Sequence, residues 1–209
     1  MIEDRQTPMT AEPFVPPKHD YTSLDRVVQG CRGCPLYMDA TQAVFGEGPT
    51  PSRLMLIGEQ PGDQEDLAGH PFVGPAGRIL DQALSAAGID RSTVYLTNAV
   101  KHFKWTRAKT GNRRLHAKPA RAEVVACQPW LIAEIDAVSP EVLVCLGATA
   151  AQSLMGTSFR ITQSRGKLFD FSDRRLMATL HPSAVLRMKS REERHAALDM
   201  LIQDLKLVA

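Results

Sequence analysis

Residues 54–62 read Leu-Met-Leu-Ile-Gly-Glu-Gln-Pro-Gly, and this stretch decides the fold of the chain. Four consecutive apolar residues are typical of a short strand that is buried on both faces, as in parallel sheets. The apolar run ends abruptly at Gly58, and Glu59 and Gln60 follow it directly. A buried strand that opens onto polar residues indicates an α/β protein with functional groups at one edge of its sheet.

Three further apolar runs repeat this pattern at residues 94–96, 142–146 and 176–180. Apolar residues at helical spacing predict helices between and around the four strands, over residues 22–29, 77–87, 120–137, 148–154 and 191–207. Strands that alternate with helices favour a parallel sheet covered on both faces. We therefore expect an α/β fold, a single three-layer α/β/α domain with a central four-stranded parallel sheet.

The composition is that of an ordinary globular protein, with 44% hydrophobic and 23% charged residues among 209. Residues 1–19 contain four prolines and little apolar periodicity, so we expect a flexible tail there and a domain over residues 20–209. No apolar run approaches the roughly 20 residues that cross a bilayer, and the start lacks a signal-peptide pattern. A cytoplasmic protein without a membrane partner is expected, as a monomer because no coiled-coil pattern is present.

The positive charge is concentrated in residues 101–121. This segment holds eight basic and no acidic residues, which turn a net charge of −6 in the rest of the chain into +2 overall. A dense basic stretch on a mildly acidic protein suits a polyanion such as nucleic acid, because neutralising phosphates supplies sequence-independent affinity. A solvated basic loop would give the same pattern.

Polar residues follow the ends of the predicted strands, at Glu59, Gln60, Asn98 and His181. In open parallel sheets the ligand crevice lies beyond the carboxyl ends of the strands. A carboxylate and an imidazole could form a general acid/base pair there, and an asparagine amide could bind the edge of an amide-like ring. Each residue taken alone could instead cap a helix or form a turn. Four of them at one edge favour a site.

The four cysteines differ in their surroundings. Cys31 and Cys34 have the two-residue spacing at which adjacent thiolates reach one metal or cluster. Cys145 lies inside an apolar run, where a small polarizable side chain fills the core. Spacing alone would suit a zinc ion held by three cysteines and a histidine at least as well as an iron–sulfur cluster.

Four ordered motifs resemble those of the uracil-DNA glycosylase superfamily, and most closely its iron–sulfur family 4. They are Gly-Glu-Gln-Pro-Gly at 58–62, His-Pro-Phe-Val-Gly-Pro-Ala-Gly at 70–77, Leu-Thr-Asn-Ala-Val-Lys at 96–101 and His-Pro-Ser at 181–183. The resemblance covers about residues 27–207. It implies the uracil-DNA glycosylase-like fold and an enzyme that removes uracil from DNA.

Within the superfamily the chain resembles the UdgX group, which has a glutamine after the motif glutamate and an inserted basic loop that ends in histidine. The corresponding residues here are Gln60 and the stretch Gly-Asn-Arg-Arg-Leu-His at 111–116. The usual loop of the group reads Lys-Arg-Arg-Ile-His, so Asn112 and Leu115 are departures. The loss of one positive charge at Asn112 puts part of the loop's phosphate affinity in doubt.

The resemblance implies how uracil is bound and released. A base in a duplex must be extruded, or taken from a single strand, before an enzyme can hydrogen-bond its edge and stack on its face. Asn98 is expected to bind the uracil edge, Phe72 to stack on the ring, and His181 to donate a hydrogen bond to the departing base. Glu59 is expected to stabilise the positive charge that develops on the sugar. Gln60 and Asp63 would arrange the sugar and the loop.

The implied UdgX-like chemistry depends on His116. A neutral imidazole at this position would capture C1′ of the sugar in place of water and leave a covalent protein–DNA link after a single turnover. Arg113, Arg114 and Lys118 are expected to bind DNA phosphates. A conventional multi-turnover family 4-like glycosylase is the alternative. A metal-stabilised nucleic-acid-binding domain without enzyme activity is a third hypothesis.

The resemblance also implies a [4Fe-4S] cluster held by Cys31, Cys34, His102 and Cys127. His102 stands where family 4 enzymes have a cysteine after the Asn-x-Val-Lys motif, and the UdgX group shares this histidine. The expected partner is uracil-containing DNA, with single-stranded DNA accepted.

Overall fold

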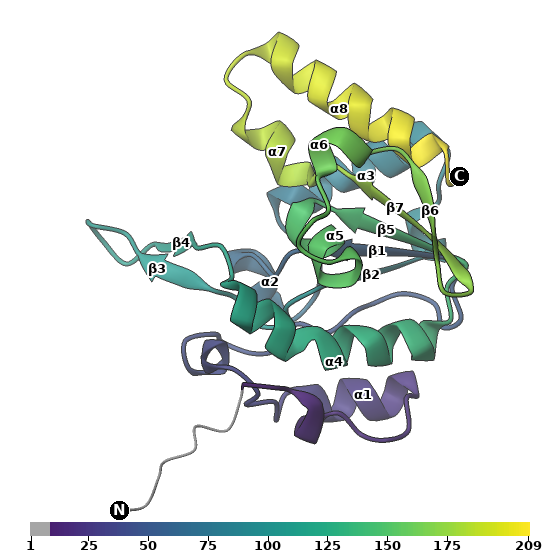
Figure 1. Ribbon diagram of the computed structural model, residues 1–209. Coiled ribbons are helices and arrows are strands. Elements are labelled where there is room, and N and C mark those ends of the chain that lie inside the picture. The colour runs from purple at the N-terminus through teal and green to yellow at the C-terminus, as the bar shows by residue number, and fades with distance from the viewer. Residues whose placement is uncertain (1–8) are drawn as a thin grey trace, which may run out of the picture.

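The sheet at the centre of the molecule has five strands in the order β2-β1-β5-β7-β6 (Figure 1). The structure is a computed structural model, and it describes residues 9–209. The strands are β1 (Leu54–Gly58), β2 (Val94–Asn98), β5 (Val142–Leu146), β6 (Leu168–Phe171) and β7 (Arg174–Thr179). The pairs β1–β2, β1–β5 and β5–β7 are parallel, and β6 pairs with β7 in the antiparallel direction.

Helices cover both faces of this sheet (Figure 1). One face is covered by α3 (Pro75–Ala87), α7 (Pro182–Arg187) and α8 (Arg191–Lys206), and the other by α4 (Arg121–Val138) and α5 (Ala148–Met155). The helix α1 (Tyr21–Val28) packs against α4. The expected three-layer α/β/α fold is confirmed, and the four predicted strands form its parallel part. The edge strand β6 was not predicted, because its alternating exposed and half-buried residues lack the continuous apolar run of a central strand. Shorter elements are η1 (Glu12–Phe14), η2 (Pro35–Met38), α2 (Asp63–Ala68), η3 (Arg91–Thr93) and α6 (Ile161–Ser164).

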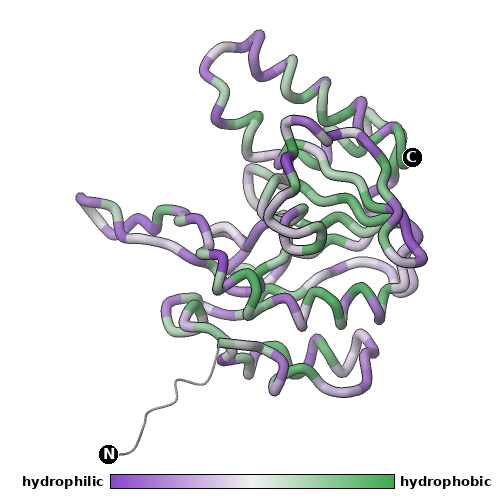
Figure 2. Tube along the Cα trace, viewed as in Figure 1, coloured by the Kyte–Doolittle hydropathy of each residue, from purple (hydrophilic) through white to green (hydrophobic). Residues whose placement is uncertain are grey.

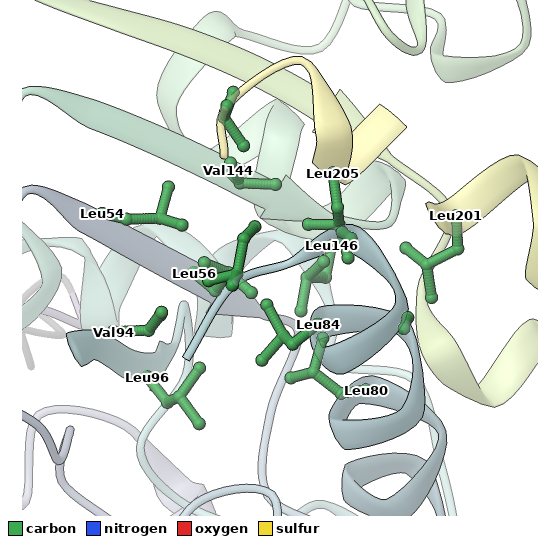
Figure 3. Close-up of a cluster of buried hydrophobic side chains, with 14 of the residues drawn as sticks. Leu54, Leu56, Leu80, Leu84, Val94, Leu96, Val144, Leu146, Leu201 and Leu205 are labelled. Carbon is green, nitrogen blue, oxygen red and sulfur yellow. The ribbon is translucent and has the colours of Figure 1, made fainter. Parts of the chain in front are cut away.

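Alternate residues of the central strands supply two separate cores, because successive side chains of a strand point to opposite faces. Leu54 and Leu56 of β1 pack with α3 and α8, as Figure 3 shows. Met55 and Ile57 pack on the other face with α4 and α5. Cys145 of β5 belongs to this second core, as expected. Figure 2 shows how the apolar residues gather on the strands and on the inner sides of the helices.

The basic segment forms a β-hairpin that projects from the domain (Figure 1). Its strands are β3 (Trp105–Arg107) and β4 (Arg114–His116), with Trp105 opposite His116 and Arg107 opposite Arg114. Figure 2 shows that the end of this hairpin is hydrophilic. The hairpin places the last residue of β4 beside the sheet edge where β1 ends.

The described part of the expected tail lies against the domain. Ala11 is buried, and its amide donates to the carbonyl of Ala126 in α4 over 2.7 Å. Residues 1–8 of that tail lie outside the described residues, and the boundary at residue 20 stays a prediction. Within residues 9–209, no helix has the length and the apolar character that crossing a membrane requires.

Candidate active site

A cleft of about 1090 Å³ opens at the carboxyl ends of the parallel strands. This is the sheet edge at which the sequence predicted a crevice. Glu59 follows β1, Asn98 ends β2, Gly147 follows β5 and His181 follows β7. The cleft brings together all ten side chains that the sequence predicted for catalysis, uracil binding and DNA binding, which are Glu59, Gln60, Asp63, Phe72, Asn98, Arg113, Arg114, His116, Lys118 and His181.

Asn98 and Phe72 form one wall of the cleft, and both lie close to Gly58. Asn98 is only 3% exposed. Phe72 is buried and has a φ of 57°, a left-handed conformation that costs free energy in a bulky residue. A Cβ atom at Gly58 would lie 2.2 Å from Asn98 Oδ1 and 2.8 Å from Phe72 Cζ, and one at Gly77 would lie 1.8 Å from the Phe72 carbonyl oxygen. Two glycines therefore permit the packing that holds this amide and this ring.

His181 is held in one tautomer at the start of α7. The amide of Ser183 donates to His181 Nδ1 over 3.1 Å, and the Ser183 hydroxyl lies 2.8 Å from the same nitrogen. A ring nitrogen that accepts from an amide carries no proton, so the proton of the neutral ring is on Nε2. Burial lowers the pKa of His181 to about 4, and nearby Arg187 acts in the same direction. His181 is thus a neutral Nε2–H donor at pH 7, with its ring stacked 6.4 Å from that of Phe72.

The two oxygens of the Glu59 carboxylate have different surroundings. Oε2 accepts a hydrogen bond from the hydroxyl of Thr149, in the first turn of α5. Oε1 lies 3.7 Å from His116 Nε2. The sequence did not single out Thr149, although its position two residues after the turn that ends β5 could have indicated it.

Gln60 joins the sheet edge to the hairpin. Its Oε1 accepts from the Lys104 amide over 3.1 Å, and its Nε2 donates to the carbonyls of Lys104 and Ala117 over 3.2 and 3.0 Å. These three contacts fix the orientation of the side-chain amide. The same Nε2 lies 2.9 Å from His116 Nε2, so the Gln60 amide also contacts the imidazole.

Arg114 fastens β4 to α2. Its Nε donates to Asp63 Oδ1 and its Nη1 to Asp66 Oδ2, each over 2.6 Å. The guanidinium also lies 5.4 Å from the ring centre of Phe103 and 5.6 Å from that of Trp105. Asp66 is fully buried, and the sequence did not indicate it. Most donors of Arg114 are therefore engaged within the protein, whereas Arg113 and Lys118 are exposed.

Lys101 lies behind the wall that Asn98 and Phe72 form and not on the basic surface where the charge pattern had placed it. Its side chain is 1% exposed and forms an ion pair with Glu134, itself fully buried. The ammonium also donates to the Asn98 carbonyl over 2.7 Å and to the Thr97 hydroxyl over 2.8 Å. Glu134 accepts further hydrogen bonds from the Tyr95 hydroxyl and the Gly46 amide. Lys101 thus supports the backbone of Asn98 and contributes no charge to a DNA-facing surface.

The four predicted cluster ligands are all buried, and the three cysteines are free thiols. Cys31, Cys34 and Cys127 belong to one packed core. Burial lowers the pKa of His102 to about 4, so its imidazole is neutral and has a lone pair to offer a metal. Trp130 lies in the same core, and its Nε1 is buried without a hydrogen-bond partner in the described part of the chain.

These buried thiols and the imidazole are chemically suited to hold a metal group. Across residues 9–209, no three histidine, cysteine or carboxylate side chains are grouped closely enough to hold one metal ion.

A family model and several relatives with similar sequences point to one family. Residues 45–206 match the family model described as the uracil DNA glycosylase superfamily. A Type-4 uracil-DNA glycosylase of Thermotoga maritima is 38% identical over 174 residues, which are 82% of this chain and 86% of that protein. The Type-4 enzymes of Pyrobaculum aerophilum and Archaeoglobus fulgidus are 38% and 37% identical over 80% and 82% of this chain, and over 85% and 87% of their own. The family match includes every predicted residue of the cleft.

Proposed function

The chain belongs to the uracil-DNA glycosylase superfamily, and we propose that it excises uracil from DNA and stays covalently linked to the sugar through His116. The glycosylase activity is supported by the family and by relatives that are named Type-4 uracil-DNA glycosylases. The covalent step is carried by one observation. His116 Nε2 lies in the cleft 3.7 Å from Glu59 Oε1, on a hairpin that Gln60 holds against the sheet edge.

Uracil would be bound by the wall that Asn98 and Phe72 form. The Asn98 amide has both a donor and an acceptor for the edge of the base, and the Phe72 ring offers a face for stacking. His181 carries a proton on Nε2 at neutral pH and can donate it as a hydrogen bond to the uracil oxygen on which negative charge develops. The rigid packing around Gly58 keeps these groups in place before the base arrives.

In the chemical step the bond between C1′ and uracil N1 breaks, and its electron pair leaves with uracil. The Glu59 carboxylate stabilises the positive charge that remains on the sugar. The lone pair of His116 Nε2 then forms a bond to C1′, which leaves an imidazolium with its proton on Nδ1. Loss of this proton gives the neutral adduct, and the uracil anion takes up one proton from solvent.

Gln60 supports this step because it holds the hairpin and His116 at the cleft. A lone pair on Nε2 is required for attack, and this nitrogen lies 2.9 Å from Gln60 Nε2. The attack also requires Nε2 to leave Gln60 for C1′. A small movement of the hairpin, or a rotation of the ring, would achieve this when DNA is bound.

The exposed side chains of Arg113 and Lys118 at the mouth of the cleft would neutralise DNA phosphates. Arg114 would act differently, since its ion pairs hold the hairpin.

Cys31, Cys34, His102 and Cys127 would hold a [4Fe-4S] cluster that ties the N-terminal turn to the basic segment. A zinc ion needs its four ligands around one point, whereas four irons spread their ligands over a larger volume. The buried thiols and the neutral imidazole suit either group, and the resemblance to family 4 and to the UdgX group favours the cluster.

A multi-turnover glycosylase is the second candidate. The relatives named Type-4 glycosylases favour it, as does the 49% exposure of the His116 side chain, which leaves room for water at the mouth of the cleft. In this reading His116 contacts the sugar but water captures it.

A denaturing gel of the protein mixed with uracil-containing single-stranded DNA separates the candidates. We expect a slow-migrating protein–DNA adduct that His116→Ala abolishes while uracil release continues, and we expect Glu59→Gln to abolish both. Thymine-containing DNA of the same sequence is the control. Free abasic DNA without an adduct would support the multi-turnover enzyme, and equal binding of both DNAs without base release would support a binding domain.

A further inference from the structure

Thr149 occupies a position that joins the cleft to the helix layer. It lies in the first turn of α5, directly after the turn at Gly147, and it is 7% exposed. Gly147 has a φ of 94°, and a Cβ atom there would lie 3.1 Å from His181 Cβ. The chain therefore passes close to His181 before it presents the Thr149 hydroxyl to the cleft. A threonine in a helix has few side-chain rotamers, so this hydroxyl is held in place.

The hydroxyl of Thr149 donates to Glu59 Oε2. Among residues 9–209, no other group donates a hydrogen bond to the Glu59 carboxylate, and its Oε1 has only the contact of 3.7 Å with His116 Nε2. A carboxylate can otherwise rotate about its last side-chain bond, because that torsion has broad and roughly two-fold preferences. One hydrogen bond to a fixed donor therefore decides which oxygen is free and where it points.

The direction of the free oxygen matters for what happens at C1′. In one outcome C1′ forms a bond to His116 Nε2. In the other it forms a bond to the oxygen of a water molecule, whose proton passes to a carboxylate oxygen of Glu59. The second outcome needs a carboxylate oxygen that faces the water. With Oε2 engaged by Thr149 and Oε1 turned to His116, the carboxylate favours the first outcome.

We propose that Thr149 is a positioning residue that holds the Glu59 carboxylate with Oε1 toward His116. This arrangement speeds uracil excision and directs the sugar to histidine rather than to water. The inference rests on the proposed function and adds a residue that acts through Glu59 without touching the substrate. A hydrogen bond to a charged group corresponds to about a ten- to hundred-fold change in an equilibrium or a rate.

The test compares Thr149→Val, which keeps the shape and loses the hydroxyl, with Thr149→Ser, which keeps the hydroxyl. Thr157→Val makes the same change on an exposed loop outside the cleft and is the matched control. For each protein we would measure the single-turnover rate of uracil release and the fraction of excised sites that end as covalent adduct on a denaturing gel. Thermal unfolding would check that all variants fold.

We expect Thr149→Val to release uracil about tenfold more slowly and to give a smaller adduct fraction, while Thr149→Ser and Thr157→Val behave as the wild type. The proposal is overturned if Thr149→Val matches the wild type, or if Thr149→Ser loses as much as Thr149→Val, because packing and not the hydroxyl would then be responsible.

The failure of the proposed function gives a different result. A wild type that releases uracil without any adduct overturns capture by His116, and the release rates of the three proteins still decide whether Thr149 positions Glu59. A wild type that releases no uracil overturns both proposals.

Discussion

The sheet edge and the hairpin face each other across the cleft, and they are held in place by different physical means. Asn98 ends β2, a buried edge strand of the sheet, where backbone hydrogen bonds to β1 and buried side chains on both faces hold it. His116 ends a three-residue strand of a projecting hairpin, where a few side-chain contacts hold it (Figure 1). The groups predicted to bind uracil are thus rigid, whereas the group predicted to capture the sugar lies on an element that can shift when DNA arrives.

The polar supports of the two regions also differ in burial. Behind Asn98, the ion pair of Lys101 and Glu134 is enclosed by protein. Beneath the hairpin, Arg114 pairs with buried Asp66 and with half-exposed Asp63. A buried charge cannot replace a lost partner with water, whereas an exposed one can. Removing a support should therefore destabilise the sheet edge more than the hairpin.

The largest effect is expected for Lys101→Met. This change leaves the Glu134 carboxylate buried without its cation, which costs about 3–5 kcal/mol of unfolding free energy. The double variant Lys101→Met with Glu134→Gln removes both charges and should recover part of that loss. Urea unfolding measures the stability of each protein. A single variant as stable as the double variant would show that the buried pair does not support this edge.

The second prediction compares how much each of the two carboxylates that pair with Arg114 contributes to stability. Asp66→Asn turns a buried partner of Arg114 neutral and should cost about 1–3 kcal/mol. Asp63→Asn makes the same change at a half-exposed partner, and surface ion pairs contribute only about 0–1 kcal/mol. Urea unfolding gives both values, and hydrogen exchange of the β4 amides reports whether the hairpin loosens. Equal costs for the two variants would contradict the view that burial decides their importance.

Sequence patterns predicted the sheet edge well because its physical causes are local. A continuous apolar run marks a strand buried on both faces, and the polar residue after it, such as Glu59 or His181, necessarily lies at the carboxyl edge. The same reasoning predicted the four parallel strands and the main helices in their order along the chain. The motifs then identified which of these polar residues to consider together.

The hairpin and the buried supports could not be predicted in this way. The strands of the hairpin have only three residues each and expose most of their side chains, so no apolar period indicates them. The amino-acid composition gives no sign that Lys101 is buried. Its burial depends on the ion pair with Glu134, which lies 33 residues away in another element. Thr149 and Asp66 likewise gain their importance from partners far along the chain.

The smallest effect concerns Gln60, the residue that links the two regions. In Gln60→Glu, a carboxylate oxygen replaces the amide beside His116 Nε2 and accepts a hydrogen bond from it, which favours an imidazolium whose Nε2 has no lone pair. We expect the rate of adduct formation at pH 7 to fall about tenfold, which is the size of effect that one hydrogen bond has on a rate. The rate of uracil release should change less. The adduct rate should recover as the pH rises and the ring loses its proton.

Gln64→Glu is the matched control, because Gln64 lines the same cleft, is exposed, and gains the same charge without contacting His116. A general effect of negative charge on DNA binding would lower adduct formation in both variants and would not depend on pH in this way. If Gln60→Glu forms the adduct at the wild-type rate at pH 7, the group at position 60 does not influence the reactivity of His116. The hairpin would then contribute only the location of the histidine, and its reactivity would come from Glu59 across the cleft.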